Sequence, residues 1–110
     1  MQRRVALARA LATGPGLLLL DEPFVSTDHR LAAELRQVVA RSIARHGPTT
    51  ILVSHEPRDA AHLADRVIRI EGRPVRIGQD ERITPSRDAR SPGDIARISA
   101  RLEEPRRPRD

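Results

Sequence analysis

The sequence LLLLDEP, from Leu17 to Pro23, decides the fold of this chain. Four consecutive leucines predict a β-strand that is buried on both faces, as in the parallel sheets of α/β proteins. The strand ends in two adjacent carboxylates, Asp21 and Glu22. Asp21 can hold Mg²⁺ through an oxygen or a water, and Glu22 can take a proton from an attacking water. The alternative interpretation is a core strand followed by a solvated acidic turn.

A second predicted strand, Thr49–Ser54, is β-branched and apolar, and it ends in His55. A helix is predicted between the two strands, with Asp28 as its cap and Gly47 as its end. The positions expected to face the core are Leu31, Leu35, Val38, Val39 and Ser42–Ile43, with Arg30, Arg36, Arg41 and Arg45 mostly on the other side.

A strand, a helix and a strand of this length form a right-handed crossover, so the two strands are expected to be parallel. Asp21, Glu22 and His55 then emerge at the same edge of one sheet. Because ligands of open α/β sheets bind at the carboxyl edge, the sequence predicts a site there.

Five segments in this order resemble the second half of an ATP-binding cassette (ABC) nucleotide-binding domain. They are VALARAL, LLLLDEP, the D-loop-like VSTD, ILVSH and LADRVIRIEG, and the resemblance covers Met1 to Gly78. It implies part of the α/β P-loop NTPase fold, with parallel strands, crossover helices and a C-terminal β-hairpin. Residues 1–78 would be the C-terminal half of the ATP-binding domain, and residues 79–110 a polar linker with a short C-terminal helix and tail.

The resemblance implies roles for four residues, with ATP and Mg²⁺ as cofactors. Asp21 would be the Walker B residue that holds the metal, and Glu22 the general base. Asp28 would be the D-loop aspartate, which communicates across a cassette dimer at the bound nucleotide. His55 would be the switch histidine that contacts the γ-phosphate. A helix over Arg3–Thr13 would follow the signature loop.

The chain also departs from the family pattern. The phosphate-binding loop G-x-x-x-x-G-K-[ST], the Q-loop, the adenine-stacking aromatic and the signature LSGG are missing, and the chain has no lysine. The D-loop reads Val25-Ser26-Thr27-Asp28 where S-A-L-D is usual. We therefore expect a chain cut just after the signature, by a miscalled start, a true truncation or a gene remnant, and inactive as an ATPase by itself.

The C-terminal part of the sequence predicts a hairpin, a linker and a helix. The hairpin strands are expected at Arg66–Ile70 and Pro74–Ile77, around a turn at Glu71–Arg73. A polar linker is expected over Gln79–Ser91. Ser91 and Pro92 then begin a helix with one apolar stripe, followed by a frayed tail. The stripe is Ile95, Ile98 and Leu102, and the tail is Glu103–Asp110.

Composition restricts the possible functions. The chain has no cysteine, so a disulfide framework or a cysteine metal site is excluded. Neither a signal peptide nor a membrane-length apolar run is visible, which predicts a cytoplasmic protein without direct membrane insertion. The net charge of +5 would suit a small nucleic-acid binder, but Phe24 is the only aromatic residue and the arginines alternate with acids. A solvated surface, with no nucleic-acid partner, is therefore expected.

The function that the resemblance implies is the ATP-hydrolysing subunit of an ABC transporter, a bacterial importer of the nitrate, sulfonate or taurine type. Its partners would be a second ATP-binding subunit, forming a dimer, and membrane-spanning permease subunits at the inner face of the plasma membrane. The alternatives are a non-catalytic cassette fragment that docks on a partner, and a cassette from a non-transport ABC protein.

Overall fold

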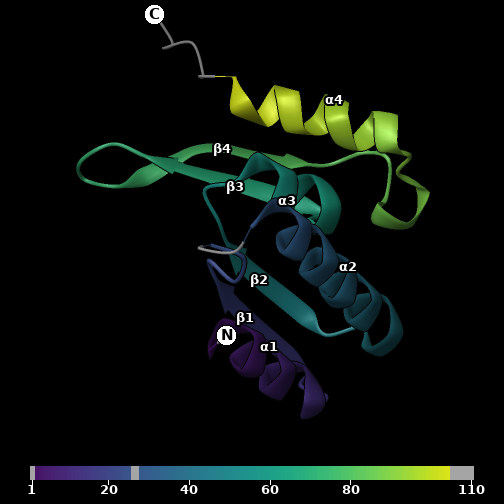
Figure 1. Cartoon of the computed structure of the whole chain (residues 1–110). Coiled ribbons are helices and arrows are strands. Elements are labelled where there is room, and N and C mark those ends of the chain that lie inside the picture. The colour runs from purple at the N-terminus through teal and green to yellow at the C-terminus, as the bar shows by residue number, and fades with distance from the viewer. Residues whose placement is uncertain (1, 26–27, 105–110) are drawn as a thin grey trace, which may run out of the picture. The chain divides into compact units, whose positions relative to one another are not determined.

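A computed structural model describes residues 2–25 and 28–104, which form two compact units, Met1–His55 and Glu56–Asp110. The first unit consists of two helices and two strands (Figure 1). In chain order they are α1 (Gln2–Ala12), β1 (Leu17–Asp21), α2 (His29–His46) and β2 (Thr49–Val53). Four elements predicted from the sequence are therefore present, each within two residues of its expected bounds.

The two strands of the first unit are parallel, as the crossover predicts. The register pairs Leu17 with Thr49 at one end and Asp21 with Val53 at the other. One further main-chain bond extends the pairing, because the amide of Glu22 donates to the carbonyl oxygen of Val53 over 2.8 Å. The carboxyl ends of the strands are therefore level.

Helix α2 begins and ends where the sequence predicts. The Asp28 carboxylate accepts a hydrogen bond from the Leu31 amide at 2.7 Å, and Gly47 adopts the left-handed conformation with a φ of 62°. The buried positions are Ala32, Leu35, Arg36, Val39 and Ile43.

Two expectations for the faces of α2 are wrong. Val38 lies 42% exposed, whereas Arg36, expected on the outer side, is buried. The buried stripe runs through Ala32, Arg36 and Val39, and Val38 falls beside it. The long apolar stem of arginine allows burial that its charge alone would disfavour.

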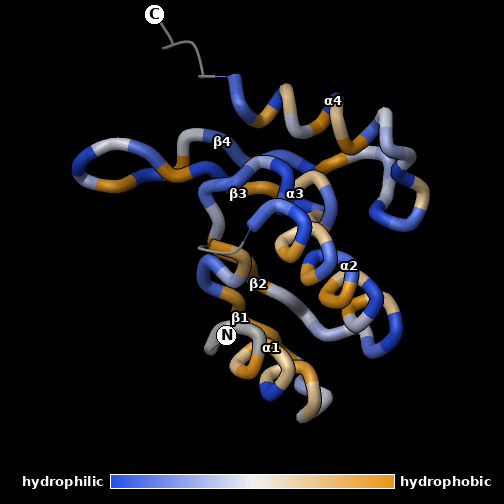
Figure 2. The backbone as a smooth tube through the Cα atoms, in the orientation of Figure 1, coloured by the Kyte–Doolittle hydropathy of each residue, from blue (hydrophilic) through white to orange (hydrophobic). Residues whose placement is uncertain are grey.

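The prediction that β1 is buried on both faces is also wrong for the described residues. Leu18 is 2% exposed, but Leu19 is 64% exposed, and the alternation holds along the strand. Figure 2 shows most of β1 as hydrophobic. Burial on both faces requires packed elements on both sides, and the described part of the first unit covers only one. The open face carries Leu17, Leu19, Ile51 and Val53.

The second unit contains the hairpin, two α-helices and a short 3-10 helix (Figure 1). Its elements are α3 (Pro57–Leu63), β3 (Arg66–Glu71), β4 (Arg76–Arg82), the short 3-10 helix η1 (Arg87–Ala89) and α4 (Pro92–Glu103). Helix α3, with Glu56 as its N-cap, was not predicted.

The antiparallel hairpin is confirmed, but its second strand lies further along the chain than Pro74–Ile77. Residues 79–82 pair with β3 and are not linker, although they are polar. These polar residues can form a strand of a two-stranded ribbon because their main chain pairs with β3. An ion pair between Arg66 and Asp80, at 2.6 Å, adds a side-chain contact between the two strands. This pairing lowers the pKa of the Asp80 carboxyl and raises that of the Arg66 guanidinium.

The core of the second unit confirms the predicted stripe of α4. Ile98 and Leu102 pack with Ala61 and Ile83, and Ile95 lies against this cluster. The helix begins at Ser91 with a capping box, in which Ser91 and Asp94 exchange hydrogen bonds. Most of the expected tail, residues 105–110, lies outside the described residues.

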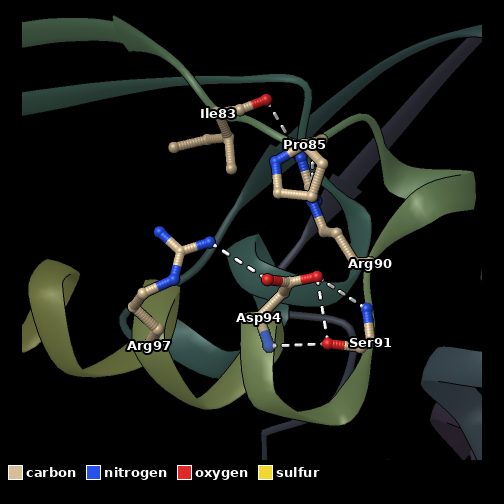
Figure 3. A network of polar contacts seen from close by, with 6 residues as sticks. All are labelled: Ile83, Pro85, Arg90, Ser91, Asp94 and Arg97. Atoms are coloured by element: carbon tan, nitrogen blue, oxygen red, sulfur yellow. Dashed lines mark hydrogen bonds and ion pairs between the residues drawn. The ribbon is translucent and has the colours of Figure 1, made fainter.

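Arg90 donates hydrogen bonds to the backbone carbonyls of three residues in the second unit, and Figure 3 shows two of them, Ile83 and Pro85. Its guanidinium donates to Pro85 at 2.9 Å, to Ala61 at 3.0 Å and to Ile83 at 3.3 Å. Partial burial lowers the pKa of this guanidinium, an effect that the Asp65 carboxylate opposes. The charged side chain thus fixes α3 and the end of the hairpin beside the start of α4.

The open face of β1 and β2 predicts self-association. Leu19→Thr combined with Ile51→Thr should reduce light scattering and binding of an apolar dye without lowering the unfolding midpoint, because both side chains are exposed. Leu20→Thr is the matched control, and loss of this buried side chain should cost about 3 kcal/mol of unfolding free energy. Unchanged scattering in the double variant would contradict the prediction.

The capping box predicts a pH dependence. Hydrogen bonds from the Ser91 amide, the Arg97 guanidinium and the Ser91 hydroxyl lower the pKa of Asp94. A carboxyl whose folded pKa is lowered contributes stability that is present above its unfolded pKa, about 4, and is lost as pH falls through the folded value. Urea unfolding between neutral and acidic pH should therefore show a smaller acid loss for Asp94→Asn than for the parent. Identical pH profiles would exclude this contribution.

Candidate functional site

The carboxyl edge of the parallel pair brings Glu22 and His55 together, as the sequence predicts. His55 Nδ1 is hydrogen-bonded to Glu22 Oε1, although the residues are 33 positions apart in sequence. Glu22 directly follows β1, and His55 follows β2 after Ser54, at the same edge of the parallel pair, so the crossover brings the two residues together. The Glu22 side chain is 24% exposed and the His55 side chain 94% exposed, so the contact faces solvent.

The chemistry of this pair fixes the proton on His55. A carboxylate only accepts hydrogen bonds, so Nδ1 must carry a proton in this contact. The opposite ring nitrogen, Nε2, then accepts a hydrogen bond when the ring is neutral and donates one when the ring is fully protonated. The exposed ring is therefore placed to meet an anionic ligand in its charged form.

The backbone of Glu22 is in an unusual conformation. Its φ is 47°, and no other non-glycine among the described residues has a positive φ. The left-handed region crowds the Cβ of an L-residue against the following carbonyl oxygen, and outliers of this kind cluster at functional sites. The strand thus ends in a turn that aims the Glu22 side chain out of the sheet edge.

Asp21 is the last residue of β1 and pairs with Val53. It continues the strand alternation on the open face, so its carboxylate is exposed. No group of three or more metal-ligating side chains occurs within residues 2–25 and 28–104. A single exposed carboxylate still fits Mg²⁺, which commonly takes one or two carboxylates together with waters and phosphate oxygens.

Asp28 is placed by the structure at the N-terminus of α2, where it is the N-cap. Its predicted role at a dimer interface is untested, and Ser26 and Thr27 of the same segment lie outside the described residues. The capping bond to Leu31 gives Asp28 a structural role within its own unit.

Two residues near the site were not predicted to have a part in it. Phe24 is buried two positions after Glu22, and the Arg36 guanidinium lies over its ring, 6.0 Å from the ring centroid. The feature of the sequence that could have indicated a role for Phe24 is its position as the chain's one aromatic residue, two positions after Glu22. Because Arg36 is charged, it was expected on the outer side of α2, although it lies on the buried stripe.

Among the helices that the structure describes, none has the length and apolar character needed to cross a bilayer.

No family model matches the chain. The chain is 51% identical over 78 residues to the Fe(3+) ions import ATP-binding protein FbpC of Pseudomonas fluorescens, covering 70% of this chain and 22% of that protein. It is 47% identical over 107 residues to FbpC 2 of Rhodococcus jostii, covering 93% of this chain and 31% of the relative.

A third relative is the aliphatic sulfonates import ATP-binding protein SsuB 3 of Rhodococcus jostii, 46% identical over 69 residues, or 63% of this chain and 26% of that protein. The chain thus spans between 22% and 31% of the length of these three curated relatives. It is homologous to part of the ATP-binding subunits of ABC importers and corresponds to a segment of an ABC cassette.

The cap of α2 can be tested separately from any role in a dimer. Asp28→Ala should lower the unfolding free energy of the chain by about 1 kcal/mol, because the Leu31 amide loses its acceptor. Asp28→Ser retains a capping oxygen and should stay close to the parent. Chemical denaturation followed by circular dichroism measures both, and equal destabilisation by the two variants would contradict the capping role.

Proposed function

We propose that this chain is the part of an ABC importer cassette that carries the metal-binding and water-activating acids, within a P-loop NTPase fold. The observation that carries the proposal is the contact of Glu22 with His55, at the edge where two parallel strands end level. The homology to subunits named as ATP-binding proteins supports it independently. The reaction is hydrolysis of ATP by attack of water on the γ-phosphate.

Glu22 is the proposed general base. Its carboxylate is partly shielded and lies at the end of a strand with one buried face. Its two oxygens provide enough acceptor sites for both His55 and a water. A carboxylate in this place orients the attacking water and accepts its proton as the bond to phosphorus forms. The strained backbone of Glu22 is consistent with a residue held for such a purpose.

His55 is proposed to contact the γ-phosphate. The bond from Nδ1 to Glu22 fixes the ring orientation, and Nε2 points its donor away from that carboxylate when the ring is fully protonated. Phosphoryl transfer depends mainly on positioning and on stabilising charge, and a ring of fixed orientation contributes to the positioning.

Asp21 is the proposed metal residue. Mg²⁺, when bound, would neutralise charge on the phosphate oxygens of ATP. The exposed carboxylate of Asp21 lies one residue before Glu22 at the strand end, and it would hold the metal directly or through water.

The nucleotide needs groups that this sequence does not supply. The chain has no lysine and no G-x-x-x-x-G-K-[ST] loop, so the phosphates of ATP would be bound by another segment or subunit. We infer a dimer with a second ATP-binding subunit, with Asp28 at the interface, and attachment to permease subunits at the inner face of the plasma membrane. Because the relatives are named for iron and for sulfonates, we assign an importer without assigning its substrate.

The test uses a chimera in which this chain replaces the matching segment of FbpC 2 from Rhodococcus jostii. Glu22→Gln should lower its rate of phosphate release by about 10²–10⁴, because the amide keeps the shape of the side chain but cannot accept the proton. ATP affinity should persist. Steady-state phosphate release and nucleotide titration measure the two effects separately.

Glu34→Gln is the matched control, because Glu34 is an exposed glutamate on α2 of the same unit. This variant should release phosphate at the parent rate. An active chimera in which Glu22→Gln has no effect would place the base elsewhere. A chimera that binds ATP but is inactive with Glu22 intact would instead favour a non-catalytic fragment.

A further inference from the structure

The left-handed conformation of Glu22 has to be imposed by its surroundings. Among the described residues, the amide of Glu22 donates to the carbonyl oxygen of Val53 at 2.8 Å, and the carbonyl oxygen of Glu22 accepts from the Val25 amide at 3.4 Å. The first continues the strand pairing, and the second closes a turn over residues 22–25. The conformation of Glu22 therefore depends on whatever holds this turn closed.

The centre of the turn is buried. Phe24 is only 6% exposed, and Pro23 before it is buried as well. The ring lies beneath the Arg36 guanidinium of α2, which is 7% exposed and 6.0 Å from the ring centroid. A desolvated cation over an aromatic face is more strongly attracted than one in water. The turn is thus tied to α2 by one side chain, two residues from Glu22.

We propose that Phe24, packed beneath Arg36, is a positioning residue that holds Glu22 in its left-handed conformation and so directs the Glu22 carboxylate to His55. Rotation about φ changes the direction of the Cα–Cβ bond, so a turn that relaxes would carry the carboxylate away from the imidazole. The inference rests on the proposed function, because it concerns the placement of the proposed base. Phe24 itself has no contact with the reacting groups in this scheme.

The contact between Glu22 and His55 can be detected by NMR without bound nucleotide. A neutral His55 bonded to the carboxylate keeps its proton on Nδ1, because Glu22 only accepts. Ring ¹⁵N chemical shifts, recorded in alkaline buffer where histidine rings are neutral, distinguish protonation at Nδ1 from protonation at Nε2. His55→Gln identifies the signal, and the exposed His29 and His46 of α2 provide reference rings.

The variants follow from the geometry. Glu22→Ala should abolish the signal of Nδ1 protonation at His55, and its spectrum provides the reference for this loss. Phe24→Ala should produce the same loss while leaving Glu22 and His55 in the chain. Phe24→Leu, which fills the pocket without a π face, and Arg36→Met, which keeps a long apolar stem, should each shift the signal part of the way.

Val39→Ala is the matched control. Val39 is fully buried on α2 in the same unit, and its truncation leaves a cavity in the core while keeping both Phe24 and Arg36. The His55 signature should survive this change. Amide dispersion in a ¹H–¹⁵N spectrum establishes which variants are folded, and if Phe24→Ala is unfolded, Phe24→Leu and Arg36→Met decide the question.

Three results would overturn the inference: folded Phe24 variants that retain Nδ1 protonation, a Val39→Ala chain that loses it equally, or a Glu22→Ala chain that keeps it. The outcome is separate from that of the proposed function. If Phe24 variants keep the signature while Glu22→Gln abolishes phosphate release in the chimera, Glu22 remains the base and only its positioning by Phe24 is wrong.

Discussion

The parallel pairing of β1 with β2 is the constraint on which the candidate site depends. Five residue pairs are in register, and the amide of Glu22 adds a bond to Val53 beyond them. A shift by one residue would turn every side chain of a strand to the opposite face. The pairing therefore decides both which leucines are buried and whether Glu22 and His55 meet.

The pairing acts together with α2, which connects the two strands. The helix begins at Asp28 and ends at Gly47, so its length is fixed by a cap at each end. Its buried stripe includes Arg36, which lies over Phe24 in the turn after β1. The same helix thus closes the crossover and holds the turn that presents Glu22.

The second unit is held together by different means. A small apolar cluster around Ile98 is supplemented by Arg90, which satisfies three backbone carbonyls, and by the capping box of α4. Charged and polar groups can take this role because each of these contacts is hydrogen-bonded, which offsets the cost of partial burial. Helix α3, which follows His55 after Glu56, belongs to this arrangement.

The sequence by itself determined the parallel crossover, the caps of α2, the apolar stripe of α4 and the meeting of Glu22 with His55. These features follow from local propensities and from the small number of allowed connections between successive helices and strands. Only the tertiary structure decided which face of β1 is open, that Arg36 is buried, that residues 79–82 form a strand and that Glu22 is left-handed. Each of these depends on neighbours distant in sequence, because burial, strand pairing and backbone strain are set by what packs against a residue.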